Sequence, residues 1–119
     1  MGWEMCIRDR ADRGGNVTLH GPGQLTAYPV LTLPGRGGGD KPDTVAYVRT
    51  VEQVVIDTLA DLGLPGATRM DDYPGVWIAP EGERPRKIAA IGVRLVRNRT
   101  LHGVALNVHP DLSLSLIHI

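Results

Sequence analysis

The pattern of apolar and polar positions predicts short strands around one helix. Apolar residues alternate loosely over 17–33 and are interrupted by Gly-Pro-Gly, which predicts a strand, a loop and a second strand. Over 45–62 apolar residues recur at three- and four-residue spacing, as on a helix with one buried face. Asp43 or Thr44 is the expected cap of this helix, and Gly63 follows its end.

The second half of the chain is dominated by strand patterns. We expect a turn into a short strand over 73–79, a hairpin-like loop over 81–86, and two β-rich segments over 87–96 and 101–108 joined by residues 97–100. The order of two strands, a helix and three strands predicts an α+β domain with a largely antiparallel or mixed sheet.

The two ends of the chain correspond to complementary DNA strings. Residues 5–10 (Met-Cys-Ile-Arg-Asp-Arg) translate ATG TGT ATA AGA GAC AG, and residues 114–119 (Leu-Ser-Leu-Ile-His-Ile) translate CTG TCT CTT ATA CAC ATC. These strings are reverse complements and match the end of a transposase adaptor used to prepare DNA libraries. We therefore expect residues 1–10 and 114–119 to be adaptor-derived, and residues 11–113 to carry the native sequence.

Composition indicates one modest soluble, globular domain. The 119 residues are 42% hydrophobic and 22% charged and contain no Phe. No apolar run approaches the roughly 18 residues that a membrane span needs, so no membrane association is expected. The one cysteine, Cys6, lies in the expected adaptor segment and predicts no disulfide.

The two halves differ in charge although the net charge is zero. Residues 1–83 carry seven Lys and Arg against twelve Asp and Glu, whereas residues 84–119 carry six against Asp111 alone. Those six are Arg84, Arg86, Lys87, Arg94, Arg97 and Arg99. The acid-free stretch 84–109 predicts either a solvated face or a surface that meets an acidic partner.

Glycine marks two candidate loops. Residues 13–25 contain Gly-Gly, His20 and Gly-Pro-Gly, which predicts either two tight turns or a loop whose backbone approaches a ligand. The glycines of 35–39 lack the closing Gly-Lys-Ser/Thr of a phosphate-binding loop, and no helix follows them directly. Phosphate binding at 35–39 is therefore disfavoured.

Few side chains suggest chemistry. Lys87 begins an apolar strand of small residues. It is either a strand-end lysine whose head group lies in water or a group that lies beside a substrate. His20 and His102 each precede a glycine. Because no native cysteine or clear carboxylate partner accompanies them, a zinc site is disfavoured. No Gly-x-Ser-x-Gly elbow indicates a serine nucleophile, and few aromatics accompany the basic stretch, which disfavours nucleic-acid binding.

Four motifs together resemble the lipoyl(octanoyl) transferase family. They are Arg-Gly-Gly-x-Val-Thr-x-His-Gly-Pro-Gly-Gln-Leu at 13–25, Pro-Gly-Val-Trp at 74–77, Lys-Ile-Ala-Ala-Ile-Gly-Val-Arg at 87–94, and Leu-His-Gly-x-Ala-Leu-Asn-Val-x-x-Asp-Leu at 101–112. They occur in the family's order and cover nearly all of 11–112. The resemblance implies the fold of biotin and lipoate protein ligases, a mixed or antiparallel sheet with helices packed on one side, present here in incomplete form.

The resemblance also implies an activity and a set of partners. It implies a cytoplasmic enzyme that transfers an octanoyl group from octanoyl-acyl carrier protein to a lysine of lipoyl domains, in 2-oxoacid dehydrogenases and the glycine cleavage H protein. The family forms a cysteine thioester and uses no cofactor or metal. The alternatives are an ATP-dependent lipoate or biotin ligase of the same fold, and a non-catalytic acyl-binding domain.

Site residues carry over from the family's motifs position by position. The family's catalytic lysine, which lowers the pKa of the cysteine thiol, matches Lys87. The substrate-binding positions match Arg13, Gly14, Gly15, Asn16, Val17, Thr18, Leu19, His20, Ala90, Ile91, Gly92, Gly103, Val104 and Ala105. The family's cysteine lies in a Pro-Cys-Gly motif shortly after the equivalent of Asp111-Leu112, where this chain enters the adaptor string. We therefore expect the parent protein to be the enzyme and this chain to be inactive.

Overall fold

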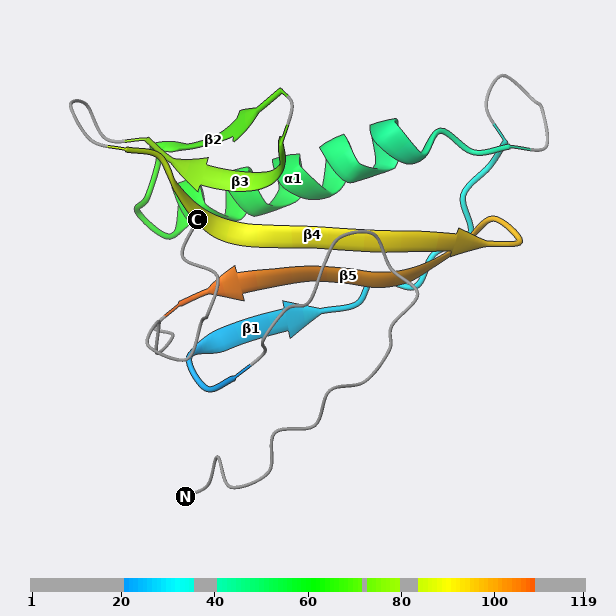
Figure 1. The fold of residues 1–119 in the computed structure, drawn as a ribbon, viewed down its shortest axis with the longest axis horizontal. Helices are drawn as coiled ribbons and strands as arrows, with labels where there is room; N and C mark the ends of the chain where they lie inside the picture. The colour runs from blue at the N-terminus through cyan, green and yellow to red at the C-terminus, as the bar shows by residue number, and fades with distance from the viewer. Residues whose placement is uncertain (1–20, 36–40, 72, 80–83, 109–119) are drawn as a thin grey trace.

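One antiparallel sheet and one helix make up the part of the chain that can be described. The computed structural model describes residues 21–35, 41–71, 73–79 and 84–108. The elements are β1 (Gln24–Ala27), α1 (Thr44–Asp61), β2 (Ala67–Met70), β3 (Tyr73–Ile78), β4 (Arg86–Val96) and β5 (Arg99–Asn107). The five strands lie in the order β1-β5-β4-β3-β2, and each pair is antiparallel (Figure 1). The predicted α+β class with an antiparallel sheet is confirmed.

Local signals account for both ends of α1. The Ala46 N–H donates to Oδ1 of Asp43 at 3.0 Å, which satisfies one of the amides left free in the first turn. At the other end Gly63 has a φ of 95°, and its N–H donates to the Ala60 carbonyl at 3.1 Å. The predicted helix and its caps are confirmed.

The longest strand pair closes through a two-residue turn. Arg97 and Asn98 have φ angles of 51° and 63°, and Val96 pairs with Arg99 across them. Two consecutive left-handed residues give a turn whose twist matches that of a hairpin, and asparagine tolerates this conformation. The predicted connection over 97–100 is therefore too long, because β5 begins at Arg99.

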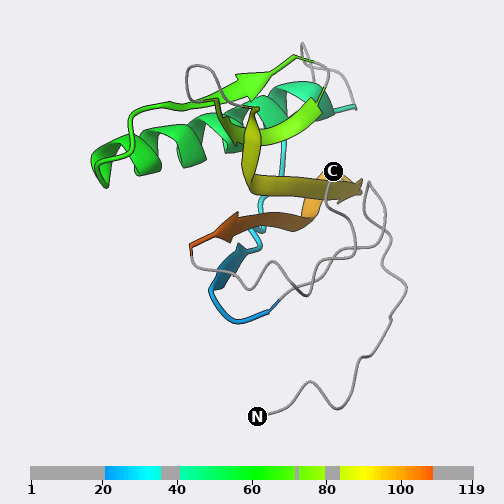
Figure 2. The same cartoon turned by 60° about the vertical axis from the view of Figure 1, so that its left-hand side comes forward.

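The core lies between α1 and one face of the sheet. Val55 and Leu59 pack against Ala67, Val76 and Ala89, and the last two are 0% exposed. Figure 2 shows α1 along this face, where it contacts β2, β3 and β4. No helix in the described ranges is long and apolar enough to cross a membrane.

The predicted helix stripe is only partly buried. Val51, like Val55 and Leu59, is buried, whereas Val45 and Leu62 are 70% and 76% exposed. These two positions were predicted to be core and are not, because they lie in the first turn and just after the end of α1. The face instead includes Tyr47 and Glu52, which are both buried.

The segments at the two sheet edges differ most from the sequence pattern. Within 21–33, the described part of the predicted alternation, the structure has one strand, Gln24–Ala27, followed by a bridge between Thr32 and Arg99. Residues 17–20 lie outside the described ranges. At the other edge β2 was not expected, because Ala-Thr-Arg-Met has little alternation and forms a strand only by pairing with β3.

Candidate functional site

Lys87 lies on the sheet face opposite α1. It is the second residue of β4 and pairs with Trp77 of β3, while Val76 pairs with Ala89. The register shifts by one residue between these pairs, so Ile88 is an extra residue in β4, a β-bulge. Because Val76 belongs to the core, alternation places Trp77 and its partner Lys87 on the other face, which we call the open face.

The ammonium group of Lys87 lies over an aromatic ring. Its Nζ is 4.9 Å from the centroid of the Trp77 ring, within the range of a cation–π interaction. Lys87 as a whole is exposed, so its ammonium group also has a solvent side. An ammonium group held in this way can stabilise a negative charge that forms beside it.

Gly75 provides the space that the lysine stem crosses. Its φ is 129°, in the region that favours glycine. A Cβ at this position would lie 2.7 Å from the Ala89 carbonyl oxygen and 3.3 Å from Cε of Lys87. The glycine of the Pro-Gly-Val-Trp motif is therefore required both by the backbone and by the lysine.

Small residues continue the open face beyond Lys87. Ala90 pairs with Ala105 and Gly92 pairs with Gly103 across β4 and β5. Directly opposite residues share a face, so these four positions present only methyl groups and hydrogens there. No bulky side chain at these positions blocks an unbranched apolar chain along β4, although the space beside Gly103 is occupied by the chain after β1.

Two expected substrate-binding residues point to the other face. Ile91 pairs with Val104, and Val104 packs against the core between the sheet and α1. The period of a strand is two residues, so Ile91 and Val104 alternate with the small positions and do not share their face. From these two positions only backbone groups are available to a ligand on the open face.

The chain after β1 lies close to Gly103. A Cβ at Gly103 would overlap the Ala27 carbonyl oxygen and would lie 2.8 Å from Cδ of Pro29. Thr100, which is fully buried, donates its hydroxyl to the Pro29 carbonyl at 2.7 Å and accepts from the Leu31 N–H at 2.8 Å. The absence of a side chain at Gly103 is thus explained by backbone packing.

Several sequence-predicted site residues cannot be placed. Those that lie outside the described ranges are Arg13, Gly14, Gly15, Asn16, Val17, Thr18, Leu19 and His20. Asp111 and Cys6 also lie outside them. His102 is described: it is half-buried in β5, opposite Val93. No group of three metal-ligating side chains occurs in the ranges that the structure describes.

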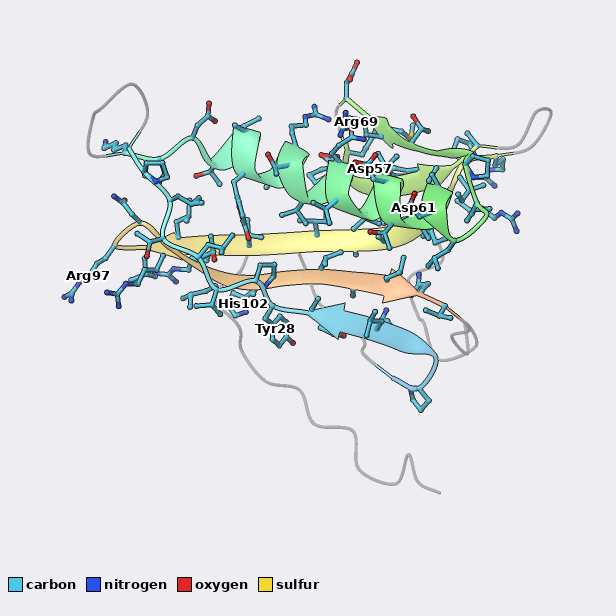
Figure 3. All side chains as sticks on the ribbon, turned by 180° about the vertical axis from the view of Figure 1, so that it is seen from behind. Tyr28, Asp57, Asp61, Arg69, Arg97 and His102 are labelled. Carbon is cyan, nitrogen blue, oxygen red and sulfur yellow. The ribbon has the colours of Figure 1, made fainter. Side chains whose placement is uncertain are left out.

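The basic side chains form two groups and not one surface. Arg84 and Arg86 lie at the Lys87 end of β4, whereas Arg97 lies at the turn, at the far end of the hairpin (Figure 3). The two ends of β4, Arg86 and Val96, are about 33 Å apart at roughly 3.3 Å per residue. Arg84 and Arg86 are thus nearer to Lys87 than Arg97 is, but Arg86 pairs with Ile78, which packs against the core, so its side chain lies on the α1 side of the sheet and not on the open face.

A buried acidic residue was missed from the sequence. Glu52 of α1 is 1% exposed, and its carboxylate oxygens lie 3.6 Å from Nη1 of Arg49 and 4.0 Å from Nε of Arg69. Because Arg69, which is labelled in Figure 3, belongs to β2, this cluster joins the helix to the edge of the sheet. The three-residue spacing from Arg49 to Glu52 was the available signal. The cluster lies on the α1 side, away from the face that carries Lys87.

Comparisons with known proteins show the family to which the chain belongs. The model of the family described as lipoyl protein ligase A/B catalytic domain matches residues 9–117. An octanoyltransferase from Salinispora arenicola is 52% identical over 103 residues, covering 86% of this chain and 46% of that protein. The octanoyltransferase from Acidothermus cellulolyticus is 52% identical over 86% of this chain and 43% of its own length.

A third relative extends the match further along the chain. The octanoyltransferase from Tropheryma whipplei is 45% identical over 114 residues, covering 93% of this chain and 48% of its own length. The chain thus spans less than half the length of these curated relatives.

Proposed function

The chain belongs to the lipoyl protein ligase A/B catalytic domain family, and from this premise we propose that the whole protein is an octanoyltransferase. In this proposal it moves an octanoyl group from octanoyl-acyl carrier protein to a lysine of a lipoyl domain. The observation that carries the proposal is the 45–52% identity to octanoyltransferases over most of this chain. The position of Lys87 on the open face, at one end of a row of small residues, is consistent with it.

The proposed chemistry has two acyl transfers. A cysteine thiolate attacks the thioester carbonyl of the octanoyl carrier, forms an enzyme thioester and releases the carrier thiolate, which takes up a proton from water. The amine of the acceptor lysine then attacks the enzyme thioester, forms an amide, loses a proton and restores the cysteine sulfur. Because a thioester conserves the activation of the acyl group, neither step consumes ATP.

Lys87 acts in this proposal on the cysteine. A nearby ammonium group favours the thiolate over the thiol and so lowers the pKa of the cysteine. We assign the cysteine to a Pro-Cys-Gly segment of the whole protein, a few residues beyond Asp111-Leu112. The far end of β5 lies beside the start of β4, since Ala89 pairs with Leu106, so the chain leaves β5 at the Lys87 end of the sheet.

The small residues of β4 and β5 are assigned to the acyl chain. Burying about seven methylene groups is worth roughly 5 kcal/mol at about 0.8 kcal/mol each. Ala90 and Ala105 lie nearest to Lys87, with Gly92 one step further along β4. We propose that Gly14 and Gly15 also line the site of the acyl chain.

The proposed partners are an acidic donor protein and a set of acceptor proteins. Octanoyl-acyl carrier protein is the donor, and lipoyl domains of 2-oxoacid dehydrogenases and the glycine cleavage H protein are the acceptors. Both must reach the reacting sulfur beside Lys87, so we propose that Arg84, which precedes β4 at the same end of the sheet, helps to meet them. Cytoplasmic localisation is part of the same proposal.

The test is octanoylation by the full-length protein. Purified protein, octanoyl-acyl carrier protein and a lipoyl domain are mixed without ATP, and the mass gained by the lipoyl domain is measured. We expect transfer, a loss of several orders of magnitude in Lys87→Met, and no change in Lys41→Met, the matched surface lysine.

Other outcomes separate the alternatives. Octanoylation that requires ATP and free octanoate identifies a ligase, and octanoyl-carrier binding without any transfer identifies an acyl-binding domain. Near-normal transfer by Lys87→Met would reduce Lys87 to a strand-end lysine.

A further inference from the structure

We propose that Trp77 is a positioning residue for Lys87, whose ammonium group it holds at the edge of the acyl site. This inference rests on the proposed function, because it assigns Trp77 a task in acyl transfer. The geometry that motivates it is independent of that function: Nζ of Lys87 lies 4.9 Å from the centroid of the Trp77 ring.

A lysine on an exposed strand end normally leaves its head group in water. Its stem has four rotatable bonds, so the ammonium group samples a wide volume unless something restrains it. The indole ring is the aromatic surface that attracts a cation most strongly. In this arrangement the ring occupies one side of the ammonium group and leaves the opposite side available to a partner anion.

The position of the ring is itself defined by its neighbours. Tyr73 meets Trp77 edge-on, with ring centroids 6.4 Å apart and an interplanar angle of 68°. Nε1 of Trp77 is buried without a hydrogen-bond partner among the described residues. A buried unpaired donor is unfavourable, so hydrogen bonding does not explain why a tryptophan lies here. The cation contact made by its ring face does.

Gly75 and the β-bulge also contribute to the position of Lys87 over the Trp77 ring. Val76 and Ala89 pair on the core side, and without the bulge Lys87, two residues before Ala89, would lie on that side too. The extra residue Ile88 places Lys87 on the same face as Trp77 instead. A side chain at Gly75 would lie 3.3 Å from Cε of Lys87 and would push the stem away from the ring. Two residues of the Pro-Gly-Val-Trp motif, Gly75 and Trp77, thus determine where the side chain of Lys87 lies on the next strand.

The lysine content of the chain makes the contact directly measurable. Lys41 and Lys87 are the two lysines in the sequence, so protein labelled with ¹³C-lysine gives two sets of Cε–Hε signals. Protons over the face of an indole ring move upfield. We expect the Lys87 signals to lie upfield of those of Lys41, to collapse onto them in Trp77→Leu, and to stay shifted in Trp77→Phe.

Either coincident Lys41 and Lys87 signals in the unaltered chain or an unchanged shift in Trp77→Leu overturns the proposal. The activity arm uses the full-length protein: Trp77→Leu should lower kcat at least tenfold with the KM for the carrier unchanged, and Trp77→Phe should restore most of it. Unaltered kcat in Trp77→Leu also overturns the positioning role.

The two proposals fail in different ways. An upfield Lys87 signal without any octanoyl transfer in full-length protein refutes the proposed function and the task given to Trp77, but leaves the contact established. Octanoyl transfer without the upfield shift refutes the role of Trp77 and leaves the proposed function intact.

Discussion

Replacing Thr100 with valine removes a hydroxyl that ties the chain after β1 to β5. Thr100 is 0% exposed, and its Oγ1 donates to the Pro29 carbonyl at 2.7 Å while accepting from the Leu31 N–H at 2.8 Å. Valine has the same shape but offers neither donor nor acceptor, so both backbone groups lose their partner.

The cost follows from the two groups left behind. A buried polar group without a partner costs about 1–3 kcal/mol. Because Leu31 is exposed, its amide can form a hydrogen bond with water instead, so its contribution to the loss of stability lies near the lower limit of this range. We expect Thr100→Val to lower the free energy of unfolding by about 2–3 kcal/mol, or the melting temperature by roughly 10–20 °C at 4–8 °C per kcal/mol.

Thr100→Ser is the matched control. It keeps the hydroxyl and removes one methyl group, which costs about 1 kcal/mol. Urea unfolding followed by circular dichroism gives the midpoint and slope for each variant, and an unchanged slope shows that stability alone has changed. The reasoning is refuted if Thr100→Val is as stable as Thr100→Ser or more stable.

Three further predictions test the core, the requirement for glycine at position 75 and the basic surface. Val76→Ala, at a 0% exposed core position, should cost about 2 kcal/mol in urea unfolding, and a cost below 0.5 kcal/mol would contradict its place in the core. Gly75→Ala should cost about 2 kcal/mol or more, because its Cβ would lie 2.7 Å from a backbone oxygen at a φ of 129°, whereas Gly66→Ala, with nothing within 4 Å, should cost less than 1 kcal/mol; equal losses would refute the clash. Arg84→Glu should weaken carrier binding by the full-length protein, more at low salt than at high, and Arg97→Glu should not; equal effects, measured by titration, would argue against docking at the Lys87 end.

Elements with strong local signals could be predicted from the sequence. The cap at Asp43, the helical spacing of valines and Gly63 sufficed for α1, since each acts within a few residues. The alternating patterns likewise predicted β4 and β5. Burial at the helix ends could not be predicted in this way: periodicity places Val45 and Leu62 on the apolar face, but the extent of the sheet decides which positions it covers.

For the site, the sequence by itself determined the residue types and the family they resemble. Lys87 and the small residues of β4 were identified from motifs, before any geometry was known. Which of them meet was decided by the tertiary structure, through the one-residue shift between β3 and β4 that places Lys87 over Trp77. Strand pairing joins segments whose separation along the chain carries no record of register, so this contact arises only when the sheet forms.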